Sequence, residues 1–322
     1  MTQSISELPR GIKLKAGVVL AFCLATIAFS VFGASLGHLS IDEIVYHLMT
    51  RSLYTVGSLD VLNGYWDIAS GGFVFPATLV NDGRLVSQYP AFYSALAVPF
   101  YAVAGYRGLF LLNAAAFCGV VWLSYLTAQR IFANRSLSLS ACLILMLATF
   151  AWDYAQAAWP HAVSMLFVVG AVYLALLTVQ SAETRKSNML AAAAGLVTGF
   201  GIGVRIDVMF VLPALILPLL FARPVRLGPA IACGLGTVPG LVILAMVNLA
   251  KFGIASPFTY GSQTASGGGN PLAYLPVARQ KPANWRFESS RQTKTVKQIL
   301  TGVFLSWLGP AFTSRQPVAP AF

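Results

Sequence analysis

Charged residues are scarce in this chain of 322 residues, where they make up 10% of the composition against 57% for hydrophobic residues. Only 10 residues are Asp or Glu, and only 3 are His. So few charges exclude an ordinary soluble globule, and the mean hydropathy is correspondingly high at +0.73. Apolar runs long enough to cross a bilayer recur along the chain. The composition therefore predicts an all-α polytopic membrane protein.

Cysteine is also sparse, which excludes a disulfide-built scaffold. The four cysteines lie inside apolar runs, have no spacing typical of a metal site, and are interpreted as small core residues: Cys23, Cys118, Cys142 and Cys233. The net charge of +11 would suggest nucleic-acid binding in a soluble protein. In a membrane protein it is typical of loops that set orientation and contact anionic lipid. We therefore expect membrane lipid, and no nucleic acid, among the partners.

The apolar runs predict about seven to eight transmembrane helices. The first, 16–36, follows a polar segment and is interpreted as an uncleaved span, with a cleaved signal peptide as the alternative. The others are expected at about 108–129, 137–152, 159–179, 189–204, 207–222 and 228–250. Two further helices are predicted to be interfacial. Residues 91–104 are too few to cross and contain Pro99, and residues 43–56 would turn Ile44, Val45 and Leu48 to one side.

These runs divide the chain into four parts: a cytoplasmic N-terminus (1–15), a transmembrane module (16–250) with a large outer loop (38–107), an outer basic loop (251–298), and a short apolar segment with a C-terminal tail (299–322). The basic loop carries six cations between residues 279 and 297 against Glu288 alone. Either it contacts phosphate groups, or the topology differs by one span near the end of the chain.

Counting spans from a cytoplasmic N-terminus places two cations in each short inner loop: Arg130 and Arg135, Arg185 and Lys186, Arg223 and Arg226. This agrees with the positive-inside rule. The same count places ionisable residues from four different span ends at the outer face: Asp42, Glu43, Asp153, His161, Arg205 and Asp207. Such a gathering predicts a site facing water or headgroups, although span ends also attract polar residues without any function. A transporter would instead place such groups near the bilayer midplane.

The order of these parts resembles the GT-C class of membrane glycosyltransferases, which includes the protein O-mannosyltransferases and the aminoarabinose transferase of lipid A. The resemblance runs over roughly residues 10–262 and is carried by Asp42-Glu43 after the first span, Asp82–Pro90, Leu112–Ala114, Trp159–Ala162 and Lys251–Gly261. It implies transfer of a hexosyl or pentosyl group from a polyprenyl-phosphate donor to a lipid, glycan or protein acceptor. It also implies a multi-pass protein of the bacterial inner membrane with a periplasmic site. Such enzymes generally have more spans, so the chain would be a C-terminally truncated member.

The resemblance further implies that Asp42 is the catalytic carboxylate and that Glu43 supports it. Transfer to a hydroxyl needs a base near the acceptor proton and cations near the departing phosphate. The cations would be Arg205, Arg84 or Lys251, and the other substrate-binding candidates are Asp153, His161, Asp207 and Tyr89. Glu43 and His47 lie one helical turn apart and could hold a divalent metal, although a surface pair is the simpler interpretation and no firm cofactor is predicted. The alternatives are a non-enzymatic transporter or assembly subunit, or an inactive truncated member.

Overall fold

The computed structural model describes residues 9–33, 37–38, 40–61, 78–81, 84–222 and 225–258. Within them the chain forms α1 (Arg10–Ala28), the π-helical turn η2 (Phe29–Gly33), α2 (Ile41–Val56), strands β1 (Thr78–Asn81) and β2 (Arg84–Ser87), α3 (Phe92–Ala104), α4 (Arg107–Phe132), α5 (Arg135–Leu147), α6 (Ala151–Ala155), α7 (His161–Gln180), α8 (Thr184–Val204), the 3-10 helix η4 (Ile206–Phe210), α9 (Val211–Leu220) and α10 (Leu227–Phe252). The cations of the predicted basic loop, the last apolar segment, Asp82 and Arg223 lie outside the described residues.

Within this part of the chain, five helices are long and apolar enough to cross a membrane: Gly11–Gly33, Arg107–Phe132, His161–Gln180, Thr184–Val204 and Leu227–Phe252. The predicted spans 137–152 and 207–222 correspond to shorter apolar helices, Arg135–Leu147 and Ile206–Leu220. The predicted short helix at 91–104 is present as α3, which keeps Pro99 inside it. The all-α membrane fold is therefore confirmed, with a small addition in the outer loop: β1 and β2 pair antiparallel, Thr78 opposite Ser87.

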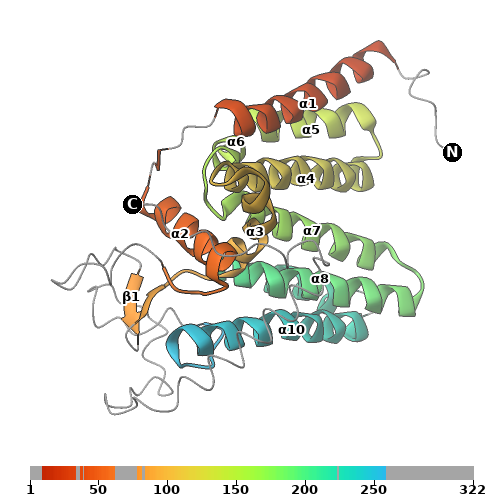
Figure 1. Ribbon diagram of the computed structural model, residues 1–322. Helices are drawn as coiled ribbons and strands as arrows, with labels where there is room; N and C mark the ends of the chain where they lie inside the picture. Colours follow the sequence, from red (N-terminus) through yellow and green to blue (C-terminus); the bar gives the residue numbers. More distant parts are fainter. Residues whose placement is uncertain are drawn as a thin grey trace, which may run out of the picture.

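Most of the long helices lie side by side in one stack, in the order α1, α5, α4, α7, α8 and α10 (Figure 1). Helices α2 and α3 and the β-hairpin lie together at one end of this stack, on the left in Figure 1. Helices α8 and α10 pack very closely, because a Cβ added at Gly195 or Gly199 would collide with the backbone of Cys233 or Thr237. Small residues allow two helix backbones to approach in this way.

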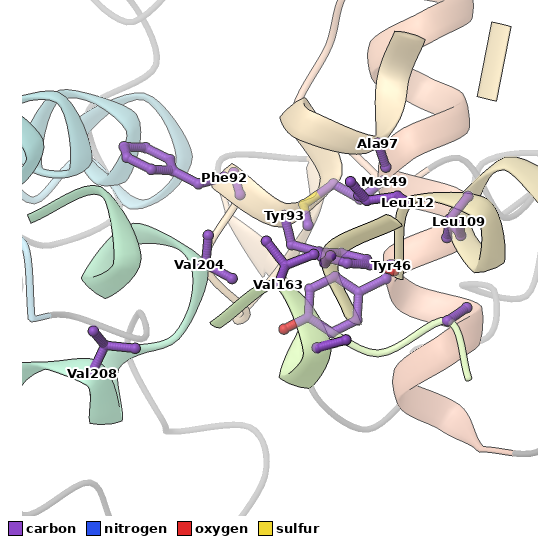
Figure 2. Packing of buried hydrophobic residues seen from close by; sticks show 14 of the residues in the cluster. Tyr46, Met49, Phe92, Tyr93, Ala97, Leu109, Leu112, Val163, Val204 and Val208 are labelled. Atoms are coloured by element: carbon purple, nitrogen blue, oxygen red, sulfur yellow. The ribbon is translucent and has the colours of Figure 1, made fainter. Parts of the chain in front are cut away.

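The main core fixes α2 and α3 onto the ends of the stack. Tyr46 and Met49 of α2 pack with Tyr93 of α3, Leu109 of α4 and Val163 of α7 (Figure 2). The predicted faces of α2 are right only in part. Val45 is buried, but Ile44 and Leu48 are only partly buried, whereas Glu43, Tyr46, Met49 and Thr50 are buried. The reason is that α2 packs against α3 and other elements rather than lying alone on an apolar surface.

The cations assigned to the inner loops gather at the opposite end of the stack. Lys15 of α1 donates to the hydroxyls of Ser136 (3.0 Å) and Ser140 (2.8 Å) at the start of α5. Arg226, just before α10, donates to the Thr178 carbonyl at 2.9 Å, near the C-terminal end of α7. A cation at that position satisfies carbonyls that the helix leaves without partners. The two ends of the stack therefore differ in charge as the sequence predicts.

Candidate functional site

The N-terminus of α2 carries the acidic pair. Ser40 has extended backbone angles and its hydroxyl accepts the Glu43 N–H at 3.3 Å, which is a helix N-cap. The same hydroxyl accepts the indole N–H of Trp159 at 2.8 Å. Asp42 and Glu43 thus occupy the first turn, where the helix dipole favours negative charge. Through its hydrogen bond to Ser40, Trp159 holds the first turn of α2 against the segment between α6 and α7.

Asp42 is half-buried, and its carboxylate is oriented by a tyrosine. The Tyr89 hydroxyl donates to Asp42 Oδ1 at 2.5 Å. The Tyr89 ring stacks on the Tyr46 ring, with centroids 5.1 Å apart and planes at 16°. Tyr46 lies four residues after Asp42 and therefore on the same side of α2. One carboxylate oxygen is held in this way, which leaves the second for a substrate.

Glu43 has a different environment, because successive residues on a helix point about 100° apart. Its side chain is fully buried, and Oε1 accepts the N–H of Ala158 at 3.0 Å. The segment that carries Ala158 is in turn held by Asn113 of α4, whose amide donates to the carbonyls of Ala157 and, at 2.8 Å, Trp159. Glu43 therefore secures the segment between α6 and α7.

A second group joins the start of α7 to the end of α8. Arg205 Nη1 lies 2.8 Å from His161 Nε2, and Arg205 Nη2 forms an ion pair with Asp207 at 2.7 Å. The hydrogen bond from Arg205 lowers the pKa of the Asp207 carboxyl. The His161 ring stacks on Tyr154 of α6, with centroids 4.4 Å apart and planes at 8°. This arrangement offers a cation, a carboxylate and aromatic faces at one place.

Two more of the predicted cations link the β-hairpin to the end of α10. Lys251 is fully buried, and its ammonium donates to the Tyr89 carbonyl at 2.5 Å. Arg84 donates to the Ala250 carbonyl at 2.9 Å and lies 3.4 Å from Asp60 Oδ1. Both cations therefore contact protein groups.

The group around Asp42 and the group around Arg205 share one electrostatic environment at Tyr46. Burial is the main cause that raises the pKa of Tyr46; Tyr89 adds to it, Arg205 lowers it, and Asp42 raises it. Asp153 is exposed on α6, and among the described residues no hydrogen bond or ion pair joins its carboxylate to either group. The structure thus brings together eight of the nine predicted site residues at one end of the stack.

Glu43 and His47 could have held a metal, but a surface pair was the simpler interpretation; that interpretation is wrong, because Glu43 is fully buried and the two side chains have separate partners. His47 Nδ1 lies 2.9 Å from His38 Nε2, and His47 Nε2 lies 3.4 Å from the Tyr101 hydroxyl. In the part of the chain that the structure describes, no three His, Cys, Asp or Glu side chains form a cluster that could hold a metal ion. Metal binding stays a prediction.

Sequence reasoning missed three residues that build the site: Tyr46, Asn113 as a support, and Ser40 as the partner of Trp159. The spacing of four between Asp42 and Tyr46 could have indicated the first. Asn113, a lone amide within an apolar span, could have indicated the second, because buried amides need partners.

Comparisons with known proteins agree with this architecture. Residues 74–227 match the family described as "Protein O-mannosyl-transferase TMEM260 N-terminal domain". The fold also matches the crystal structure of ArnT from Cupriavidus metallidurans bound to undecaprenyl phosphate, with a TM-score of 0.54 and 16% identity over 72% of this chain. The chain therefore has an ArnT-like, all-helical membrane fold. It spans 42% of the length of the ArnT chain. Among curated proteins, none matches it.

Proposed function

We propose that this GT-C-like chain transfers a hexosyl or pentosyl group from a polyprenyl-phosphate donor to a hydroxyl of a lipid, glycan or protein acceptor at the outer face of a membrane. The observation that carries the proposal is the half-buried Asp42 carboxylate at one end of a stack of apolar helices, where it is oriented by Tyr89 and, like Arg205, lies near enough to Tyr46 to affect the pKa of that residue. The likeness to ArnT, whose structure holds undecaprenyl phosphate, supports the donor class.

Asp42 is the proposed general base. As the acceptor oxygen attacks the anomeric carbon, the acceptor O–H breaks and its proton passes to the Asp42 carboxylate. The bond from the anomeric carbon to the phosphate oxygen breaks at the same time, and polyprenyl phosphate leaves with the electron pair. Because Tyr89 already occupies Oδ1, the base is held in one orientation, which lowers the entropic cost of reaching the transition state.

Arg205 is the proposed partner of the departing phosphate. Its side chain is 29% exposed, and Asp207, which it pairs with, is 51% exposed. A phosphate can therefore reach the guanidinium and compete with Asp207, and a guanidinium binds phosphate oxygens in a bidentate manner. Lys251 has no exposed surface, so it is poorly placed for direct contact. Asp153, His161 and the Tyr154 ring offer hydrogen-bonding and stacking groups for a sugar.

The test is sugar transfer by an Asp42→Asn variant in membranes supplied with labelled polyprenyl-phosphate sugars. Asparagine keeps the shape and accepts from Tyr89 but cannot take up the proton, so the rate should fall about 10²–10⁴-fold. The matched control is Glu183→Gln, which removes an acidic group beside α8 at the opposite end of the stack. Glu43→Gln should be milder, because its amide oxygen still accepts from Ala158. Wild-type-like transfer by Asp42→Asn, per mole of monodisperse protein, would refute the base assignment, whereas absence of transfer by the wild-type chain would favour a non-enzymatic role.

A further inference from the structure

Tyr89 contacts both Asp42, the proposed base, and the C-terminal end of α10. Its hydroxyl donates to Asp42 Oδ1 at 2.5 Å, while its own carbonyl accepts from the ammonium of Lys251 at 2.5 Å. Tyr89 and Lys251 are 162 positions apart in the sequence. The backbone of Tyr89 is therefore held by α10, while its side chain holds the Asp42 carboxylate on α2.

The position of Tyr89 is fixed by several independent contacts. Its N–H donates to the Ser87 hydroxyl at 3.0 Å, and its ring stacks on Tyr46. Residue 90 is proline, which restricts the backbone of the preceding residue to extended conformations. The strand before it, β2, is tied to the same helix end, because Arg84 donates to the Ala250 carbonyl. The tyrosine hydroxyl can thus present its proton in one direction.

Lys251 has the environment of a structural cation. It lies in the last turn of α10, which ends at Gly253 with φ of 71°. A positive charge is favourable there because of the helix dipole. The side chain is fully buried, and its ammonium lies 4.8 Å from the Phe252 ring centroid as well as against the Tyr89 carbonyl. Burying a cation is costly unless such partners compensate, and drawing it out to a phosphate would break both contacts.

We propose that Lys251 and Tyr89 are positioning residues for the transfer reaction: Lys251 fixes the backbone of Tyr89, and the Tyr89 hydroxyl orients Asp42. This inference rests on the proposed function. It replaces direct substrate binding, the role that the sequence suggested for both residues. A change at the end of α10 is therefore expected to alter the orientation of the Asp42 carboxylate.

The experiment compares Tyr89→Phe, Lys251→Met and Lys251→Arg with wild type in kcat and in donor KM. Tyr89→Phe removes one hydroxyl and keeps the ring, so kcat should fall about 10- to 100-fold, the range expected for one hydrogen bond to a charged group. The donor KM should change little.

Lys251→Met should produce the same pattern, and Lys251→Arg should recover part of the rate because arginine can still donate to a carbonyl. The matched controls are Tyr54→Phe, an exposed tyrosine on α2, and Lys186→Met at the start of α8. Both should keep wild-type kinetics. Binding of undecaprenyl phosphate to the chain in lipid nanodiscs gives a readout that needs no turnover. Lys251→Met should keep the wild-type affinity to within about threefold, since one lost phosphate contact would cost far more.

The outcomes separate this inference from the proposed function. Loss of undecaprenyl-phosphate binding by Lys251→Met with an unchanged kcat would overturn the positioning role and make Lys251 a phosphate ligand. An inactive Asp42→Asn together with wild-type kinetics in Tyr89→Phe would leave the function standing and overturn the inference. If the wild-type chain transfers no sugar, a double-mutant cycle in thermal unfolding between Tyr89→Phe and Asp42→Ala still tests the link, because each change removes the hydrogen bond. Additive effects in that cycle would overturn it.

Discussion

Replacing Asn113 tests whether the segment between α6 and α7 is held as the structure indicates. Asn113 is fully buried on α4, and its amide nitrogen lies against the carbonyls of Ala157 and Trp159 and 3.1 Å from the Tyr93 hydroxyl. The amide has two hydrogens, so Asn113→Ala removes two hydrogen bonds and leaves two carbonyls without these donors. Each buried group left unpaired costs about 1–3 kcal/mol. The expected loss is therefore about 2–6 kcal/mol in the free energy of unfolding.

A loss of that size should lower the thermal midpoint by about 3–9 °C for a chain of this length. The assay is thermal unfolding of detergent-solubilised protein, with sugar transfer measured below the midpoint. Transfer should also fall, because Ala158, which binds Glu43, and Trp159, which binds Ser40, belong to the loosened segment. Asn113→Asp should be at least as harmful, since it sets a carboxylate oxygen against carbonyl oxygens.

The matched control is Asn134→Ala, which removes the N-cap of α5 at the opposite end of the stack, where Asn134 Oδ1 accepts the Leu137 N–H at 3.1 Å. Losing an N-cap costs about 0.5–2 kcal/mol, and transfer per folded molecule should not change. If Asn113→Ala is no more destabilising than Asn134→Ala, or destabilises without lowering transfer, then the proposed support of the acidic turn by this segment is wrong.

Three further predictions use other parts of the structure. Gly199→Leu should destabilise the protein by more than about 2 kcal/mol in an unfolding assay, because the new side chain would collide with the backbone of α10. The control Gly234→Leu should be tolerated in the same assay, because no atom lies within 4 Å of its Cβ position. Burial, helped by His38 and Arg51, lowers the pKa of His47 from its ordinary 6.5 to about 4. The unfolded chain then takes up a proton before the folded one, so thermal stability should decline as pH falls from 6.5 toward 4; a His47→Gln variant that declines equally in this window would contradict the assignment. Single cysteines at positions 183 and 153, replacing Glu183 and Asp153 in a chain without its native cysteines, should react with an impermeant maleimide from opposite sides of the membrane. If both cysteines are labelled from the same side, the common outer site is refuted.

The sequence alone was sufficient for the features that depend on local chemistry. The long apolar runs predicted the main helices, since a bilayer-spanning helix must satisfy its backbone internally and be apolar outside. The structure places an N-cap at Ser40 and a residue at positive φ at Gly253, two helix ends of the kind that serine and glycine favour by their local chemistry. Alternating span directions were enough to place Asp42, His161 and Arg205 at one end of the stack. The buried face of α2 was the exception, because an apolar count does not anticipate a buried Glu43.

Only the tertiary structure decided what each of these groups does. Asp42 and Glu43 are neighbours in the sequence, yet one is oriented by Tyr89 and the other is fully buried against Ala158. The two side chains leave α2 in directions about 100° apart, and which direction meets the β-hairpin depends on how α2 packs on α3. Lys251 looks like a phosphate ligand in the sequence, and its burial against a carbonyl 162 positions away makes it a support instead. Contacts of that separation are set by the packing of whole helices, which a pattern of neighbouring residues does not encode.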